Sequence, residues 1–315
     1  MRIAATIESI ARRAGVVAAG VVAVAGLMTG CASSPERAAR DNAPAADPDA
    51  LLAAALRSWS VENNPEQALR LAAQATAAAP TRAEAVLFHL RLCAETPRCE
   101  TQPLEVLLKK LAPDNGVVWL SALKRAQTTA DEQGEAQILA AMSRAREFNV
   151  YWTTLVQRLT TATHNAPPPR TGEQVSAPLA TALNEVVARL SALTVPAFSP
   201  IPAACTRESA REPERRAVCE RIAQALERGD TYIAEGLGLG LAQQFAAPGS
   251  ASANEIEQRI DALGYRNRTA GAIVAAQVER DKFSAELLEL MKKVPREQDV
   301  YLAILRWAGQ PLTPD

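Results

Sequence analysis

The chain has 315 residues, of which 48% are hydrophobic, so it is long enough to form a buried core. Lys and Arg number 34 against 35 Asp and Glu, and a net charge of -1 excludes the basic surface that nucleic-acid binding requires. Aromatic residues make up only 4% and alanine is abundant, which favours closely packed helices over β-sheets.

The first thirty residues have the features of a secretory signal peptide. A basic start that includes Arg12 and Arg13 precedes an apolar run from Ala14 to Leu27. As a helix this run would cover about 21 Å, which is shorter than the ~30 Å hydrocarbon core of a bilayer. We therefore predict a cleaved leader over residues 1–30.

The motif MTGC at residues 28–31 follows the apolar run and resembles the lipobox of bacterial lipoproteins, although Met28 stands where that family usually has Leu. The resemblance implies cleavage before Cys31 and a lipid anchor on this residue, since several acyl chains hold a protein firmly to a membrane. Ala32, where an Asp would mark inner-membrane retention, points to the periplasmic leaflet of the outer membrane. An ordinary signal peptide with a chance cysteine is the alternative. Residues 31–49 lack apolar periodicity and are predicted to be a flexible tether.

Four further cysteines are expected to form disulfides, because the periplasm that the lipobox implies is oxidising. Four cysteines allow three connectivities, and proximity in the sequence favours Cys93–Cys99 and Cys205–Cys219. The competing interpretation is a metal or thiolate site formed by His89, Cys93 and Cys99. Only three possible ligands are present, and an oxidising compartment favours disulfides over free thiolates, which argues against this site. We therefore predict no metal site and no cofactor.

An internal period of 33 residues runs through the first half of the chain. Trp119 and Trp152 are 33 residues apart and end the similar blocks PDNGVVW and REFNVYW, and two Ala-Pro pairs ending at Pro80 and Pro113 have the same spacing. The small residues and proline ahead of the first turn resemble the second helix of a tetratricopeptide repeat: Ala68, Ala75 and Pro80. The resemblance implies an all-α fold, with an α-solenoid of tetratricopeptide-like hairpins over residues 50–163.

A solenoid of this kind presents a concave groove lined by the first helix of each hairpin. The polar side chains on the expected first helices are therefore candidate contacts with a partner, although they are equally compatible with ordinary surface: His89, Arg91, Ser121, Lys124 and Arg125.

Residues 164–178 contain three consecutive prolines and are predicted to link the repeats to a second helical region over residues 179–312. A proline-rich excursion held by Cys205 is expected near residues 195–205. Helices are then expected from Pro213 to about Glu227 and over four later ranges: 252–263, 270–280, 282–292 and 297–308. Whether this region continues the solenoid or forms a separate bundle stays open.

Catalytic motifs are scarce, and no catalytic residue is predicted. Gly236, Gly238 and Gly240 form a GxGxG without the βαβ context of a dinucleotide site, so we interpret them as allowing close helix packing. Glu208-Ser209, followed by GLAQ at residues 240–243, faintly resembles the signature of lytic transglycosylases. Glu208 lies among charged residues, without the apolar surroundings that raise the pKa of a catalytic acid.

The sequence thus predicts an outer-membrane-anchored periplasmic lipoprotein that acts as a helical-repeat protein-interaction scaffold or assembly factor. Its expected partners are the membrane, through Cys31, and a protein of the envelope. An inhibitor or immunity lipoprotein that uses the Cys93–Cys99 loop as a wedge against a periplasmic enzyme is the alternative. A peptidoglycan lytic enzyme is a third hypothesis.

Overall fold

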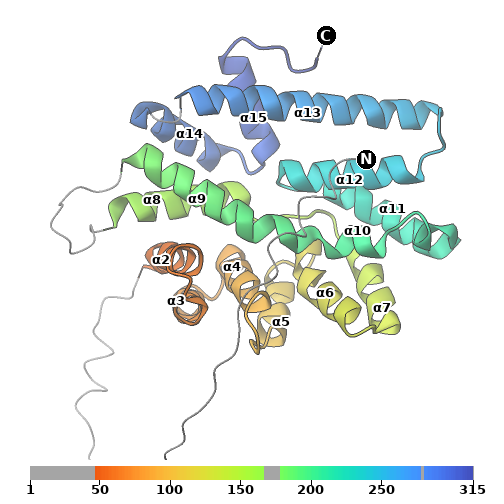
Figure 1. The fold of residues 1–315 in the computed structure, drawn as a ribbon, viewed down its shortest axis with the longest axis horizontal. Coiled ribbons are helices and arrows are strands. Elements are labelled where there is room, and N and C mark those ends of the chain that lie inside the picture. The colour runs from red at the N-terminus through yellow and green to blue at the C-terminus, as the bar shows by residue number, and fades with distance from the viewer. Residues whose placement is uncertain (1–46, 167–177, 278–279, 315) are drawn as a thin grey trace, which may run out of the picture. The chain divides into compact units, whose positions relative to one another are not determined.

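The computed structural model describes residues 47–166, 178–277 and 280–314 (Figure 1). Within these ranges the regular elements are helices and no β-strand occurs, so the predicted all-α class is confirmed. The predicted leader (1–30), Cys31 and most of the predicted tether (31–49) lie outside the described residues. The first described helix already begins at Pro48, because Asp47 caps it by accepting a hydrogen bond from the Asp49 N–H.

The described helices fall into three groups (Figure 1). The first group forms three successive hairpins: α2 (Pro48–Ser60) with α3 (Pro65–Ala78), α4 (Ala83–Ala94) with α5 (Gln102–Leu111), and η1 (Gly116–Trp119) and α6 (Leu120–Thr128) with α7 (Glu132–Met142). The second group is α8 (Trp152–Asn165), α9 (Leu179–Thr194), η2 (Val195–Phe198) and α10 (Pro200–Ala204). The third is η3 (Ser209–Arg211), α11 (Pro213–Glu227), α12 (Tyr232–Phe245), α13 (Ala251–Gln277), α14 (Asp281–Lys293) and α15 (Glu297–Trp307).

The first hairpin shows how the sequence builds this architecture. The Asn64 side chain caps α3 by accepting a hydrogen bond from the Gln67 N–H, and Pro65 occupies the first turn of the helix, where no N–H is needed. Ala68 and Ala75 have no exposed surface, and α3 packs against both α2 and α4. The small side chains thus allow the helices to approach closely, as the spacing of Ala68 and Ala75 in the sequence predicts.

The two blocks that are 33 residues apart lie side by side. Asn115 and Glu147 form an isolated β-bridge, and the Asn115 side chain both donates to the Asn149 carbonyl at 2.7 Å and accepts from the Asn149 N–H at 3.0 Å. Gly116 packs so closely on Phe148 that an added Cβ would lie 2.4 Å from the tip of the ring. The sequence period therefore corresponds to two stacked turns between helices.

The first helices of the three hairpins are covered by the second group of helices. The helix α9 contacts α2 and α4, while η2 and α10 contact α6 (Figure 1). The Gln127 side chain of α6 donates to the Pro200 carbonyl at 2.9 Å. The proline-rich segment expected near residues 195–205 is thus folded into the short helices η2 and α10, because Pro196 and Pro200 each stand at the start of one, where a proline is tolerated.

Two elements of the second half differ in bounds from the prediction. The helix expected from Pro213 to Glu227 is confirmed with those ends, but the helices expected over 252–263 and 270–280 are one continuous helix, α13. The intervening residues include Gly264 but no proline, and a single glycine weakens a helix without ending it. The helices α14 and α15 lie within one residue of their predicted bounds.

The described helices share one main hydrophobic core, which extends from Leu52 in α2 to Leu305 in α15, and the described residues form one compact unit. The predicted division at 164–178, of which residues 167–177 are not described, therefore does not separate two cores. Leu179–Ala204 is the one described stretch long and apolar enough to cross a membrane, with a mean hydropathy of 1.3. Its helices instead pack against α2, α4, α8 and α14.

Candidate functional site

A buried turn between α11 and α12 connects the two halves of the protein through Asp230. This side chain is only 3% exposed, and its two carboxylate oxygens accept hydrogen bonds from the Val150 and Trp152 N–H groups, both at 2.8 Å. Tyr151, at the N-cap of α8, has a left-handed backbone (φ 59°) and makes no side-chain capping bond. Asp230 therefore supplies, from 78 residues further along the chain, the acceptor that the start of α8 lacks.

Glu297 performs the same task on the other side of this turn. Its Oε2 accepts from the Tyr232 N–H in the first turn of α12 at 2.9 Å, and its Oε1 accepts from the Tyr301 hydroxyl at 3.0 Å. The Glu297 N–H donates to the Asp230 carbonyl at 2.8 Å. The Gln298 side chain donates to the carbonyls that flank Asp230, those of Gly229 and Thr231. The starts of α8, α12 and α15 are thus joined by two carboxyl groups.

Burial has the largest effect on the pKa of both carboxyl groups. Burial raises the pKa of Asp230 to about 7, against the opposing effect of the Trp152 and Val150 N–H groups, and the nearby Glu297 carboxyl raises it further. Burial also raises the pKa of Glu297, and burial together with Glu297 raises the pKa of Tyr301. Among the described residues, no lysine or arginine side chain contributes to the pKa shift of Asp230 or of Glu297.

An apolar pocket of about 350 Å³ lies next to Glu297, between α8, α9, α13, α14 and α15. Its walls are formed by Trp152, Leu183, Asn184, Val187, Gly271, Val274, Ala275, Leu287, Met291, Glu297, Val300, Tyr301 and Ile304. A Cβ added to Gly271 would meet no atom within 4 Å, so this glycine borders open space. A mostly apolar concave site with a few convergent polar groups is typical of small-molecule pockets.

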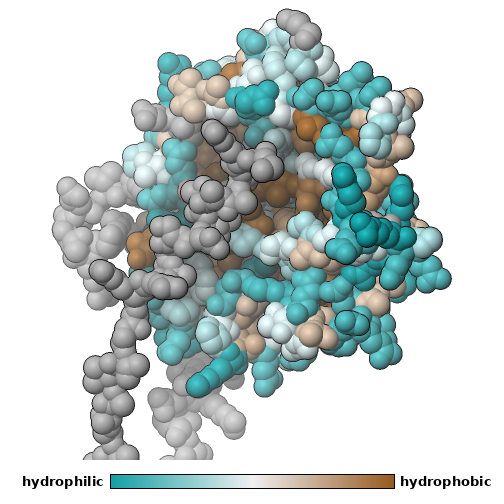
Figure 2. Space-filling model, turned by 45° about the vertical axis from the view of Figure 1, so that its right-hand side comes forward, coloured by the Kyte–Doolittle hydropathy of each residue, from teal (hydrophilic) through white to brown (hydrophobic). Residues whose placement is uncertain are grey.

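Apolar surface continues beside this pocket, in a groove that shares Leu287 and Ile304 with it. On the face drawn in Figure 2, the most hydrophobic surface lies in a hollowed central area, and hydrophilic residues surround it. A groove of about 240 Å³ between α14 and α15 is lined by Phe283, Glu286, Leu287, Leu290, Ala303, Ile304 and Trp307. Trp307 is 61% exposed, and its ring lies 6.1 Å from that of Phe283.

Of the five residues predicted to line a groove, most already have partners in the chain. His89 is half-buried with Nδ1 3.2 Å from the Thr76 hydroxyl, and burial lowers the pKa of His89. Lys124 is exposed and pairs with Glu95 at 2.8 Å, and Arg125 forms two hydrogen bonds with the Glu105 carboxylate.

Arg91 and Ser121, the other two predicted groove residues, are not exposed. Burial lowers the pKa of Arg91 to about 10, and its Nη2 has no hydrogen-bond partner among the described residues. Ser121 is half-buried. The five predicted side chains therefore do not converge on one open site in the structure, and Lys124 is the exposed member of the set.

Both predicted disulfides are formed. Cys93 pairs with Cys99 and Cys205 with Cys219, with Cα–Cα distances of 5.2 and 5.7 Å. The first pair uses the two thiols that the competing metal site at His89 would have needed. Among the described residues, no group of three or more His, Cys, Asp and Glu side chains could hold a metal ion.

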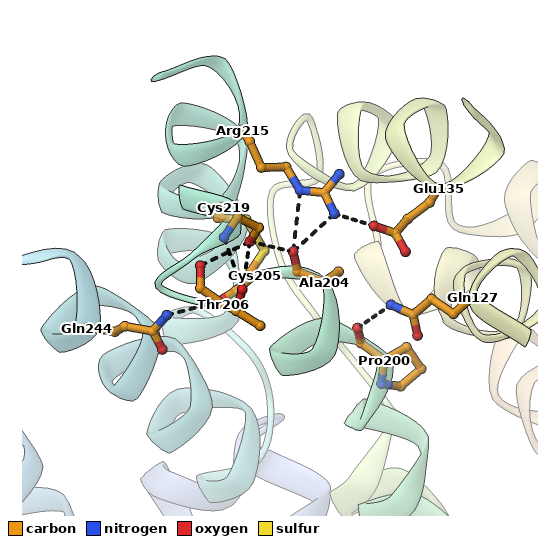
Figure 3. The surroundings of a disulfide bond; sticks show 10 residues. Gln127, Glu135, Pro200, Ala204, Cys205, Thr206, Arg215, Cys219 and Gln244 are labelled. Carbon is orange, nitrogen blue, oxygen red and sulfur yellow. Dashed lines mark hydrogen bonds and ion pairs between the residues drawn. A yellow bond between two sulfur atoms is a disulfide. The ribbon is translucent and has the colours of Figure 1, made fainter. Parts of the chain in front are cut away.

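The Cys205–Cys219 disulfide lies where four helices meet (Figure 3). Arg215 of α11 pairs with Glu135 of α7 and also donates to the Ala204 carbonyl at the end of α10 at 3.0 Å. Gln244 of α12 donates to the Cys205 carbonyl at 3.2 Å. The disulfide therefore fixes the covering segment η2–α10 to the third group of helices.

Removing this disulfide is expected to lower the stability of the protein markedly. The double substitution Cys205→Ala and Cys219→Ala should reduce the free energy of unfolding by about 3 kcal/mol, as expected for a loop of this length, and the matching change at Cys93 and Cys99 should cost less. Urea unfolding followed by circular dichroism measures both. Equal midpoints for wild type and the Cys205/Cys219 variant would contradict this expectation.

The two segments of the lytic-enzyme hypothesis lie close to one another, but Glu208 lies outside the cleft that they line. A shallow cleft is lined by Pro202, Thr206, Arg207, Gly240, Gln243 and Gln244, so the two segments meet. Glu208, the residue that would have to donate a proton, is exposed and does not line the cleft.

Comparison of the chain with protein-family models, curated proteins and solved structures returned no match. The structure thus defines an all-α protein of helical hairpins with an apolar pocket beside the half-buried Glu297 carboxyl, which lies next to the buried turn that holds Asp230. Neither Asp230 nor Glu297 belongs to a recognisable sequence motif. The sequence around Asp230 indicates only a turn, since Gly229 and Thr231 flank it just before α12. Glu297 is indistinguishable in the sequence from other acidic residues in the first turn of a helix.

Proposed function

We propose that this protein is an outer-membrane-anchored periplasmic lipoprotein whose folded part acts as a helical-repeat protein-interaction scaffold or assembly factor. The observation that carries the proposal is the division of the five cysteines. Four of them pair locally in two disulfides, which are typical of oxidising compartments. The fifth, Cys31, directly follows the apolar run in the lipobox-like motif, so it is left for a lipid anchor.

The three hairpins support a tetratricopeptide-like origin of the N-terminal half. Small residues are buried in α3, and the blocks around Trp119 and Trp152 form stacked turns at the predicted period. Since α9, η2 and α10 cover the first helices of these hairpins, a protein partner would meet a surface other than an open groove. Cross-linkers attached at exposed residues of different helices, such as Lys124 of α6 and Trp307 of α15, would identify the surface that contacts the partner.

The anchor is tested by the substitution Cys31→Ala. In membrane fractionation of bacterial cells, the wild-type chain should partition with the outer membrane, and the variant should move to the soluble periplasmic fraction because it has no acylated thiol. The Cys93→Ala and Cys99→Ala variant serves as a control, since it removes cysteines without touching the motif. A wild-type chain found mainly in the soluble fraction would contradict the anchor.

An inhibitor or immunity lipoprotein is a second candidate, in which the exposed loop closed by Cys93–Cys99 would act as the wedge against an enzyme. Glu95, Pro97 and Arg98 of this loop are exposed, and Arg98 has a left-handed backbone with φ 65°. The disulfide holds this exposed loop in one conformation, which reduces the entropy lost on binding. Cross-linking followed by mass determination separates the two functions, because an inhibitor binds one enzyme in a fixed ratio and a scaffold joins a larger assembly.

A further inference from the structure

We propose that the pocket between α8, α9, α13, α14 and α15 is a binding site for a small organic amine with an apolar body, held at its ammonium group by Glu297. This inference is independent of the lipid anchor and of any protein partner. Three features of the described residues support it: the shape of the pocket, the bonding of Glu297, and the absence of a cation beside that carboxyl group.

The pocket has the size and lining of a small-ligand site. Its volume of about 350 Å³ is at the lower end of the range for such sites. Apolar side chains from five helices form most of its wall, and Gly271 leaves open space where another residue would place a Cβ. A ligand body that fills this space would bury apolar surface at ~25 cal/mol per Å² without a change in the fold.

Glu297 is arranged as a hydrogen-bond acceptor at the wall of this pocket. Each of its carboxylate oxygens receives one donor, the Tyr232 N–H or the Tyr301 hydroxyl. An ionised carboxylate can accept about four hydrogen bonds, so two acceptor positions stay available for a ligand. Because both existing partners donate, a ligand that also donates fits this site, whereas a second carboxylate does not.

The charge of the site favours a cationic donor. The neighbouring Arg296 does not neutralise Glu297, since its side chain is directed to the Gly229 carbonyl and to the Glu235 carboxylate. Asp230, the other carboxyl group at this turn, carries no positive charge in either protonation state, so it does not neutralise Glu297 either. Attraction between opposite charges is much stronger in an apolar pocket than in water, and a charge-assisted hydrogen bond is about twice as strong as a neutral one.

Isothermal titration calorimetry with three probes of nearly equal shape tests the proposal. Phenethylamine carries the ammonium group, 2-phenylethanol is its neutral counterpart, and 3-phenylpropanoate is its anionic counterpart. We expect the purified protein to bind phenethylamine at least tenfold more tightly than the alcohol and to show no heat with the carboxylate. The substitution Glu297→Gln should bring the amine and the alcohol to within about twofold of each other.

Two further variants show whether the probes bind in this pocket or elsewhere on the protein. Gly271→Phe should block binding of both the amine and the alcohol by filling the space beside Gly271, and since Gly271 is exposed, its thermal unfolding should stay close to wild type. Glu289→Gln, an exposed charge on α14 outside the pocket, should leave binding unchanged. The proposal is overturned if the amine binds no tighter than the alcohol, or if Gly271→Phe binds as well as wild type.

Discussion

Replacing Asp230 by alanine is expected to lower the free energy of unfolding by about 2–4 kcal/mol. The substitution leaves the buried Val150 and Trp152 N–H groups without acceptors, and each unsatisfied buried donor costs about 1–3 kcal/mol. Part of this cost is offset because the carboxyl group itself no longer has to be buried. Urea unfolding at pH 7, followed by circular dichroism, measures the loss.

Asp261→Ala is the matched control for this experiment. Asp261 is an exposed aspartate within α13, so its replacement should change stability by less than about 0.5 kcal/mol. If Asp230→Ala unfolded at the same urea concentration as Asp261→Ala, the role of Asp230 in joining α8 to the turn before α12 would be contradicted.

The contribution of Asp230 to stability should also depend on pH. Burial raises its pKa from 3.8 to about 7, so the folded protein binds a proton that the unfolded chain has lost between these values. This contribution is therefore fully present below about pH 4 and is lost as the pH rises through 7. Asp230→Asn cannot titrate, so its stability should fall less than that of wild type between pH 5 and pH 8. A parallel dependence in both proteins would contradict the raised pKa.

The local features of this fold could be predicted from the sequence because each one depends on neighbouring residues. The helix from Pro213 to Glu227 begins at a proline and ends just before Gly229, and the disulfides join cysteines 6 and 14 residues apart. The blocks around Trp119 and Trp152 were visible as a repeat because the same stacked turn requires similar residues twice.

The features that define the candidate site could not be predicted because they depend on distant pairs. Glu297 reaches Tyr232 across 65 positions, and Asp230 reaches Trp152 across 78, with no motif that marks either pair. The covering of α2 and α4 by α9 was likewise hidden, since an apolar helical pattern shows that a face is buried but not which helix buries it. The prediction of an open groove therefore went beyond what periodicity alone can support.

Gly238→Ala and Gly240→Ala are expected to have opposite effects, although the two glycines are two residues apart in α12. A Cβ at residue 238 would lie 2.6 Å from the Ala223 carbonyl oxygen and 2.8 Å from the Glu227 nitrogen, both in the backbone of α11. A backbone cannot yield as a side chain can, so Gly238→Ala should lower the free energy of unfolding by about 2–3 kcal/mol. The interpretation that these glycines allow close helix packing is thus confirmed for Gly238.

Gly240 has no such neighbour, because a Cβ at that residue would meet no atom within 4 Å. Its replacement by alanine should raise the free energy of unfolding by up to about 1 kcal/mol, since alanine loses less backbone entropy than glycine in a helix. Thermal and urea unfolding of the two variants beside wild type measure both changes. Because the two substitutions add the same methyl group to the same helix, a Gly238→Ala variant that is as stable as Gly240→Ala would contradict the close approach of α11 to α12 at Gly238.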